Sequence, residues 1–224
     1  MKKQLLVFTN IFQRIMPCFH KFHNDLSLDN LTFEPTTLIV GTFNPEWPEN
    51  NDAEWFYGRT QNNSFWNVLP RIYGEESLLN EDVQAWKDFC HRNLIAITDL
   101  ISCIVDADID NPQHNLWLGN YGDNNIVNQF NEQIPIDLIG VLENNPSINN
   151  IYLTRGVIGA DATFWANIWN PVNNQFINKR FRELLTPSGN ARFQLGRYNR
   201  QNLNNQLNLA DFILMRWQEK WHQL

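Results

Sequence analysis

Four short apolar runs, each followed by turn-forming or polar residues, constrain the fold of this chain more than any other feature. The runs are Thr37–Val40, Leu94–Ile97, Asn150–Thr154 and Phe181–Thr186. Runs of this length and composition are typical of strands that are buried on both faces. Because helical periodicity fills the stretches between them, the sequence predicts an α/β fold. We expect a three-layer α/β/α sandwich around a central, mostly parallel four-stranded sheet.

The helical stretches recur along the whole chain. Apolar residues at three- and four-residue steps predict an N-terminal helical segment over about residues 1–30, broken near Pro17. Further helices are expected at residues 64–73, after a cap at Asn80, at residues 161–169, and along an apolar stripe from Leu203 to Trp221. Since no repeat, linker or break in composition divides it, we expect residues 1–224 to form a single domain.

The charge of the chain limits how it can bind nucleic acid. Its 224 residues carry a formal net charge of −7, whereas proteins with a broad nucleic-acid surface usually carry a basic excess. Residues 176–200 are the exception, with six basic residues against the single acidic Glu183. Any contact with nucleic acid is therefore expected to be local and to involve this basic segment.

The cysteines and the hydropathy pattern suggest a cytoplasmic protein. Three widely spaced cysteines imply no disulfide framework, and no run approaches the ~20 apolar residues of a membrane span. Cys18, His20, His23 and Asp25 lie close together and leave zinc open as an alternative. However, Cys18 and His20 would diverge on a helix, so core packing is the preferred interpretation. We expect no cofactor, no metal and no membrane contact.

The loops after the predicted strands are where a ligand is expected, since ligands of such folds bind outside the carboxyl ends of the strands. After the first strand, Gly41 permits close approach to the backbone, and Pro45 fixes the bend that presents the Asn44 amide. Aromatic side chains at both ends of residues 54–66 enclose glycine and amides, a composition that suits a slot for a flat heterocycle. The turn at residues 186–192 offers hydroxyl and N–H groups to phosphate oxygens.

In this order, the three motifs resemble those of the uracil-DNA glycosylase superfamily. They are the segment from Gly41 to Pro45, the loop that ends in Asn63-Ser64-Phe65-Trp66, and the segment from Pro187 to Arg192. The resemblance is nearest to the mismatch-specific uracil/thymine and hypoxanthine-DNA glycosylase branches. It implies a base-excision DNA repair enzyme that hydrolyses the N-glycosidic bond of a flipped uracil, hypoxanthine or mismatched thymine. Damaged or mismatched DNA is then the partner.

The resemblance also implies roles for individual residues. Asn44 would be catalytic and position the attacking water, while Phe56 or Tyr57 stacks on the base and Asn63 shapes its pocket. The remaining pocket residues would be Gly41, Thr42, Phe43 and Pro45. The residues that bind DNA would be Thr186, Pro187, Ser188, Gly189, Asn190 and Arg192, and Asn190 or Arg192 would fill the gap in the duplex.

Departures from the family pattern leave a second function open. One extra residue separates Gly41 from Asn44, Asn190 replaces an apolar wedge, and Thr186 stands where the most active uracil branch has a histidine. The alternative is a weak or inactive superfamily member that binds nucleic acid or a nucleobase without releasing a base.

Overall fold

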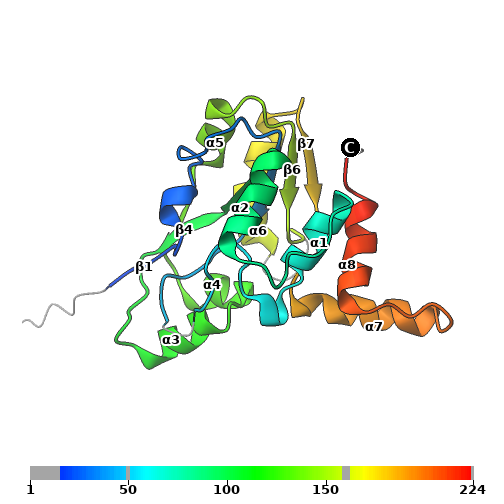
Figure 1. Ribbon diagram of the computed structural model, residues 1–224. Helices are drawn as coiled ribbons and strands as arrows, with labels where there is room; N and C mark the ends of the chain where they lie inside the picture. The colour runs from blue at the N-terminus through cyan, green and yellow to red at the C-terminus, as the bar shows by residue number, and fades with distance from the viewer. Residues whose placement is uncertain (1–15, 49–50, 158–161, 223–224) are drawn as a thin grey trace, which may run out of the picture.

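The computed structural model describes residues 16–48, 51–157 and 162–222 (Figure 1). Its strands are β1 (Cys18–Phe19), β2 (Thr37–Gly41), β3 (Ile95–Asp99), β4 (Ile101–Ile104), β5 (Gln133–Pro135), β6 (Asn150–Leu153) and β7 (Arg180–Glu183). Its α-helices are α1 (Phe65–Ile72), α2 (Val83–Arg92), α3 (Pro112–Gly119), α4 (Asp123–Gln129), α5 (Leu138–Asn144), α6 (Ala162–Gln175), α7 (Arg192–Gln201) and α8 (Leu209–Gln218). Short 3₁₀ turns lie at His23–Asp25, Thr60–Asn62 and Gly189–Ala191.

The central sheet confirms the predicted fold class. Its four strands lie in the order β3-β2-β6-β7, and all three pairings are parallel. Side chains of β2 alternate between two cores: Leu38 and Val40 pack with residues of α5 and α6, whereas Ile39 packs with residues of α1, α2 and α8. Since helices cover both faces of the sheet, the molecule is a three-layer sandwich.

Aromatic side chains fill the core beside α1, α2 and α8. Trp66 of α1 stacks on Trp86 of α2 with 5.0 Å between ring centroids, and Trp217 of α8 meets Phe65 edge-on. Figure 1 shows α1 and α8 side by side at one edge of the sandwich. These packed rings hold the start of α1 against the sheet, and with it residues 54–66, which we call the aromatic loop.

A second sheet, which the sequence analysis did not predict, joins the first at Asp99. It is antiparallel, with the order β1-β4-β5. The chain leaves the parallel sheet at the end of β3 and continues into β4, where Leu100 N–H donates to Gly41 O and Ile101 N–H donates to Thr42 O. This second sheet brings the segment around His20 to the carboxyl end of β3.

Several predicted elements are wrong in detail. Residues 16–30 form β1 and a 3₁₀ turn instead of a helix, because β1 pairs with β4; residues 1–15 lie outside the described part. The side chain that caps α2 is Asp82, not Asn80, since Asp82 Oδ1 accepts the Ala85 N–H at 2.9 Å. The C-terminal stripe begins too early, because Leu203 is 73% exposed and precedes α8.

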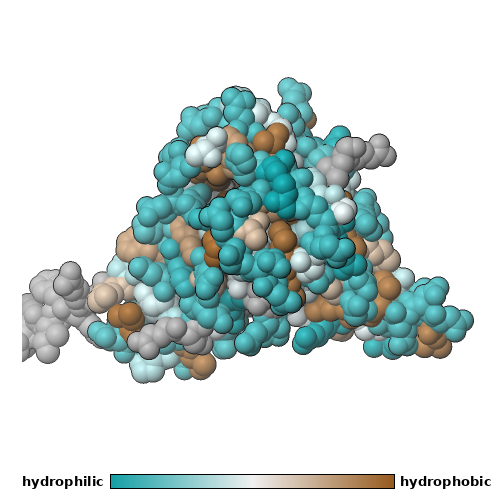
Figure 2. Space-filling view, viewed as in Figure 1, coloured by the Kyte–Doolittle hydropathy of each residue, from teal (hydrophilic) through white to brown (hydrophobic). Residues whose placement is uncertain are grey.

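The surface drawn in Figure 2 is mostly hydrophilic, with apolar atoms in small, separate groups. In the described residues, no helix combines the length and the apolar character that crossing a membrane requires. All three cysteines are buried free thiols.

Candidate functional site

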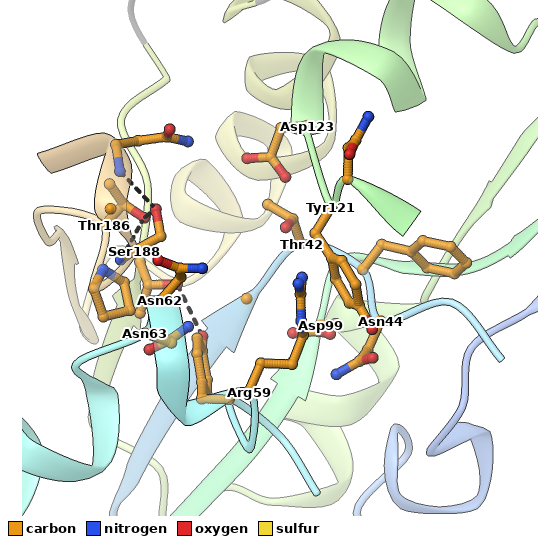
Figure 3. Close-up of a pocket in the computed structure, with 18 of the residues that line it drawn as sticks. Thr42, Asn44, Arg59, Asn62, Asn63, Asp99, Tyr121, Asp123, Thr186 and Ser188 are labelled. Atoms are coloured by element: carbon orange, nitrogen blue, oxygen red, sulfur yellow. Dashed lines mark hydrogen bonds between the residues drawn. The ribbon is translucent and has the colours of Figure 1, made fainter. Parts of the chain in front are cut away.

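A pocket of about 460 Å³ opens at the carboxyl edge of the parallel sheet (Figure 3). We call the residues at and next to the strand ends the floor: Gly41, Asn44, Tyr57, Asp99 and Thr154. We call the loop after β7 the rim: Thr186, Pro187, Ser188, Gly189, Asn190 and Arg192. Thr42, Phe43, Arg59, Asn62, Asn63, Asn120, Tyr121 and Asp123 complete the wall.

Asp99 is the buried carboxylate of the floor. Its Oδ2 lies 2.7 Å from His20 Nε2, and the His20 ring is fully buried. Because His20 Nδ1 accepts the Phe22 N–H at 3.0 Å, the ring is the neutral tautomer that donates from Nε2 to Asp99. The rings of Phe22, Phe43 and Phe56 surround His20 at 5.5–5.8 Å. This apolar collar fixes the imidazole, which in turn fixes the carboxylate.

Gly41 is required because the carboxylate and a phenol lie against its backbone. A Cβ at this position would lie 2.0 Å from Asp99 Oδ1 and 2.8 Å from Tyr57 Oη. Real Cβ atoms do not approach other atoms so closely, so any side chain here would displace part of the floor. The glycine at the end of β2 therefore makes room for the polar groups of two other segments.

The Asn44 amide is held from behind by a second amide. Asn51 Nδ2 donates to Asn44 Oδ1 at 2.9 Å and also to the backbone oxygen of Pro45. Both side chains are buried, and Asn51 Oδ1 in turn accepts the Ala53 N–H at 3.2 Å. Asn44 Oδ1 keeps one lone pair, and no described protein group takes a hydrogen bond from its Nδ2.

Tyr57 is locked in place on the floor. Its ring stacks on Phe65 with centroids 3.8 Å apart, and its backbone φ is +57°, which is uncommon for a residue other than glycine. Since the Thr154 hydroxyl donates to Val40 O, Tyr57 Oη donates to Thr154 Oγ1 at 2.8 Å. Burial, followed by the charge of Asp99, raises the pKa of Tyr57 well above its usual value, so the phenol stays protonated.

The rim is built by local hydrogen bonds. The Ser188 hydroxyl lies 3.0 Å from Thr186 Oγ1 and caps the 3₁₀ turn that leads into α7. Ser64 N–H donates to Pro187 O at 2.8 Å, and Asn63 pairs with Ser188 in a β-bridge. This bridge joins the aromatic loop to the rim, whose Asn190 and Arg192 side chains are exposed.

Charged side chains complete the wall. The guanidinium of Arg59 lies over the ring of Tyr121, with Cζ 3.4 Å from the ring centroid. Asp123, in the first turn of α4, pairs with Arg155 at 2.8 Å. The pocket thus combines two acidic and two basic side chains with amides and hydroxyls: Asp99, Asp123, Arg59 and Arg192.

Most of the residues singled out by sequence lie around this pocket, but two do not. Gly41, Thr42, Phe43, Asn44, Tyr57, Asn63 and all six rim residues line it. Phe56 is 1% exposed and packs against His20 and Phe22 beneath the floor, and Pro45 is also buried outside the lining.

The basic segment is divided by the fold. Arg192 lines the pocket. Lys179 and Arg180 lie at the amino end of β7, which is the opposite edge of the sheet, where Lys179 Nζ donates to Pro146 O at 3.0 Å. Basic residues that are close in sequence therefore do not form one surface.

Sequence analysis missed Asp99, His20, Arg59 and Tyr121 as site residues. Asp99 had a usable signal, because it lies two residues after the second predicted strand, Leu94–Ile97, at the edge where ligands are expected. His20 was considered only as a zinc ligand. Its two ring nitrogens are both hydrogen-bonded to protein groups, and burial raises the pKa of the Cys18 thiol to about 12. No cluster of metal-binding side chains occurs among residues 16–48, 51–157 and 162–222.

The fold and the pocket define an α/β sandwich protein with a polar pocket at the carboxyl edge of its sheet. A scan against models of protein families finds no match to this chain, and a search of curated proteins finds none either. Among solved structures, the chain is similar to an NMR structure from Methanosarcina acetivorans described as a "putative Uracil DNA glycosylase". The two share 15% identity over 84% of this chain and 92% of that one, with a TM-score of 0.49.

Proposed function

We propose that this protein is a DNA glycosylase of the uracil-DNA glycosylase superfamily, which hydrolyses the N-glycosidic bond of a flipped damaged or mispaired base. The observation that carries the proposal is the buried Asp99 carboxylate, fixed by His20 in the same pocket as the Asn44 amide. The three sequence motifs that resemble the superfamily support it, since each contributes residues to the lining of this pocket.

The reaction needs a group that favours positive charge at the sugar and removes a proton from water. When the bond between C1′ and the base nitrogen breaks, its electron pair leaves with the base, and the sugar becomes cation-like. In our proposal the Asp99 carboxylate stabilises this charge. It also accepts the water proton as the water oxygen bonds to C1′, and the departing base anion takes a proton from solvent.

The Asn44 amide would align the water. Its Oδ1 has one lone pair left after the bond from Asn51, and this lone pair can accept a water O–H. An amide is too weak a base to take the proton, so the roles divide: Asn44 orients the water and Asp99 activates it. At the rim, Thr186, Ser188 and Arg192 would hold phosphate oxygens of the flipped nucleotide.

Single-turnover cleavage of duplexes that carry uracil, hypoxanthine, or thymine opposite guanine tests this proposal. We expect release of free base from at least one duplex. Asp99→Asn keeps the shape of the side chain but removes the carboxylate that accepts the water proton. It should slow release of the nucleobase by about 10²- to 10⁴-fold. Asn44→Ala should slow it by at least about tenfold, since the water loses its alignment.

Lys179→Gln at the opposite edge of the sheet is the matched control, and it should cleave at the wild-type rate. Unchanged cleavage in Asp99→Asn would refute the role of Asp99, and unchanged cleavage in Asn44→Ala would refute that of Asn44. If the folded wild-type protein releases no base from any of the three duplexes, the proposed glycosylase activity is refuted.

Two carboxylates in the pocket and the acidic balance of the chain favour a second candidate, a non-catalytic module that binds nucleic acid or a nucleobase. Asp99 and Asp123 both line the site and oppose phosphate, and the whole chain carries a charge of −7. This candidate predicts base-dependent binding without release of base, so the same duplexes distinguish the two functions.

A further inference from the structure

We propose that Tyr121 is the surface on which the flipped base stacks, and that the Arg59 guanidinium occupies this position until the base arrives. The inference rests on the proposed function and adds the place of the base within the pocket. Figure 3 shows both side chains in the pocket together with Asn44 and Asp99.

The distance between Arg59 and the Tyr121 ring is that of a stacked base. Arg59 Cζ lies 3.4 Å from the centroid of the Tyr121 ring. A guanidinium is planar and delocalised, and both guanidinium groups and nucleobases stack on aromatic faces. A flat ring of purine or pyrimidine can therefore take the space of the guanidinium without moving the tyrosine.

Tyr121 directly follows the C-cap residue of α3, where its N–H donates to Leu118 O at 3.1 Å in a conformation that is uncommon for tyrosine. Its φ is +50°, in the left-handed region that residues other than glycine seldom adopt. Its hydroxyl is buried and has no hydrogen-bond partner among the described residues. The residue connects α3 to α4, and its ring forms a wall of the pocket. Strained residues of this kind concentrate at ligand sites.

Arg59 is held weakly enough to leave. Its side chain is 34% exposed, and its nearest carboxylate is Asp52 at 3.9 Å, whose own side chain is 71% exposed. Screening by water makes such a pair contribute little. The guanidinium can thus swing away from the ring, where it remains available to a phosphate.

The other aromatic rings of the pocket are less suitable. Tyr57 has one face covered by Phe65, and its hydroxyl is bonded to Thr154. Phe43 is 7% exposed and meets the His20 ring edge-on. Among the described aromatic residues of the lining, Tyr121 is the one that carries a partly exposed guanidinium over its ring.

Binding of two short single strands to the whole protein tests the inference. One strand carries a central uridine or inosine with a 2′-fluoroarabino sugar, which resists cleavage because fluorine disfavours positive charge at C1′. The other carries a tetrahydrofuran abasic site at that position. The dissociation constant of the abasic strand divided by that of the strand with the base measures what the base contributes to binding. This ratio is independent of phosphate contacts and of cleavage.

We expect Tyr121→Ala to reduce this ratio by about 5- to 150-fold, the usual contribution of a base stacked on an aromatic side chain. Tyr121→Phe, which keeps the ring, should stay within about twofold of wild type. Tyr121→Leu fills the space without an aromatic face; should alanine prevent folding, leucine is expected to show the loss. Phe19→Ala, at a half-exposed ring outside the pocket, is the matched control and should not change the ratio.

Arg59→Ala separates a placeholder from a direct contact. If Arg59 only occupies the position, the ratio should stay the same or rise. A loss as large as that of Tyr121→Ala would overturn the placeholder role. A wild-type ratio near one for both bases, or an unchanged ratio in Tyr121→Ala, would overturn the stacking surface. If the ratios change as expected but no duplex is cleaved, the stacking role of Tyr121 is supported and the glycosylase activity is overturned. If duplexes are cleaved but Tyr121→Ala leaves the ratio unchanged, the glycosylase activity is supported and the stacking role is overturned.

Discussion

The floor and the rim of the pocket differ in how their polar groups are held. On the floor, Asp99 is paired with His20, which lies 79 residues away in sequence, and Asn44 is backed by the buried Asn51. On the rim, Ser188 bonds to Thr186 and caps its own turn, within a partly exposed loop. The floor is therefore a product of tertiary packing, whereas the rim is mostly a local structure. Substitutions on the floor should alter stability and chemistry, and substitutions on the rim should alter binding.

The largest effect is expected where the floor loses the partner of its carboxylate. His20→Leu leaves Asp99 buried without its hydrogen-bond donor, which should lower the free energy of unfolding by about 2–4 kcal/mol. Urea denaturation measures this loss. The double variant His20→Leu, Asp99→Asn should recover part of the stability, because no unpaired charge is then buried. Strictly additive losses would show that the two side chains are not coupled.

A methyl group at Gly41 should lower the free energy of unfolding somewhat less than His20→Leu does. Because its Cβ would lie 2.0 Å from Asp99 Oδ1, Gly41→Ala should lower stability by about 1–3 kcal/mol and displace the carboxylate. The matched control on the rim is Gly189→Ala, whose Cβ would meet only the Arg192 side chain at 3.9 Å and should change stability by less than about 0.5 kcal/mol. Equal melting curves for the two variants would contradict the difference between floor and rim.

The strongest stability effect on the rim itself should come from its cap. Ser188→Ala removes the hydroxyl that accepts the Asn190 N–H, at a cost of about 1 kcal/mol. Thermal unfolding by circular dichroism measures it, and Ser188→Asn should retain much of the stability because asparagine also caps. If alanine and asparagine behave alike, the cap does not stabilise the rim.

The smallest effect should be confined to binding. Arg192→Gln should weaken binding of a single strand by about threefold and lower the magnitude of its salt slope by about 0.7, as expected for one lost phosphate contact. Lys179→Gln, from the same basic segment but the opposite edge of the sheet, should change neither quantity. Fluorescence anisotropy at several salt concentrations measures both. Identical behaviour of the two variants would mean that Arg192 makes no phosphate contact.

The elements that sequence analysis predicted well are those whose signal is local. The runs at Thr37–Val40 and Asn150–Thr154 correspond to β2 and β6, because buried parallel strands are apolar along their whole length. The amphipathic stretch at residues 64–73 contains α1 for a similar reason. The helix expected around residues 1–30 fails in its described part because β1 finds its partner in β4, and the three- and four-residue spacing cannot reveal that pairing.

The amino-acid sequence by itself determined the parallel sheet, three of the loops that line the pocket, and the turn chemistry of the rim, since each depends on residues that are neighbours in the chain. Only the tertiary structure decided that His20 meets Asp99, that Asn51 backs Asn44, that Arg59 covers Tyr121, and that Lys179 lies far from Arg192. The physical reason is that hydrogen bonds and packing between distant segments depend on how two sheets join at Asp99. The spacing of residues along the sequence does not predict where the two sheets join.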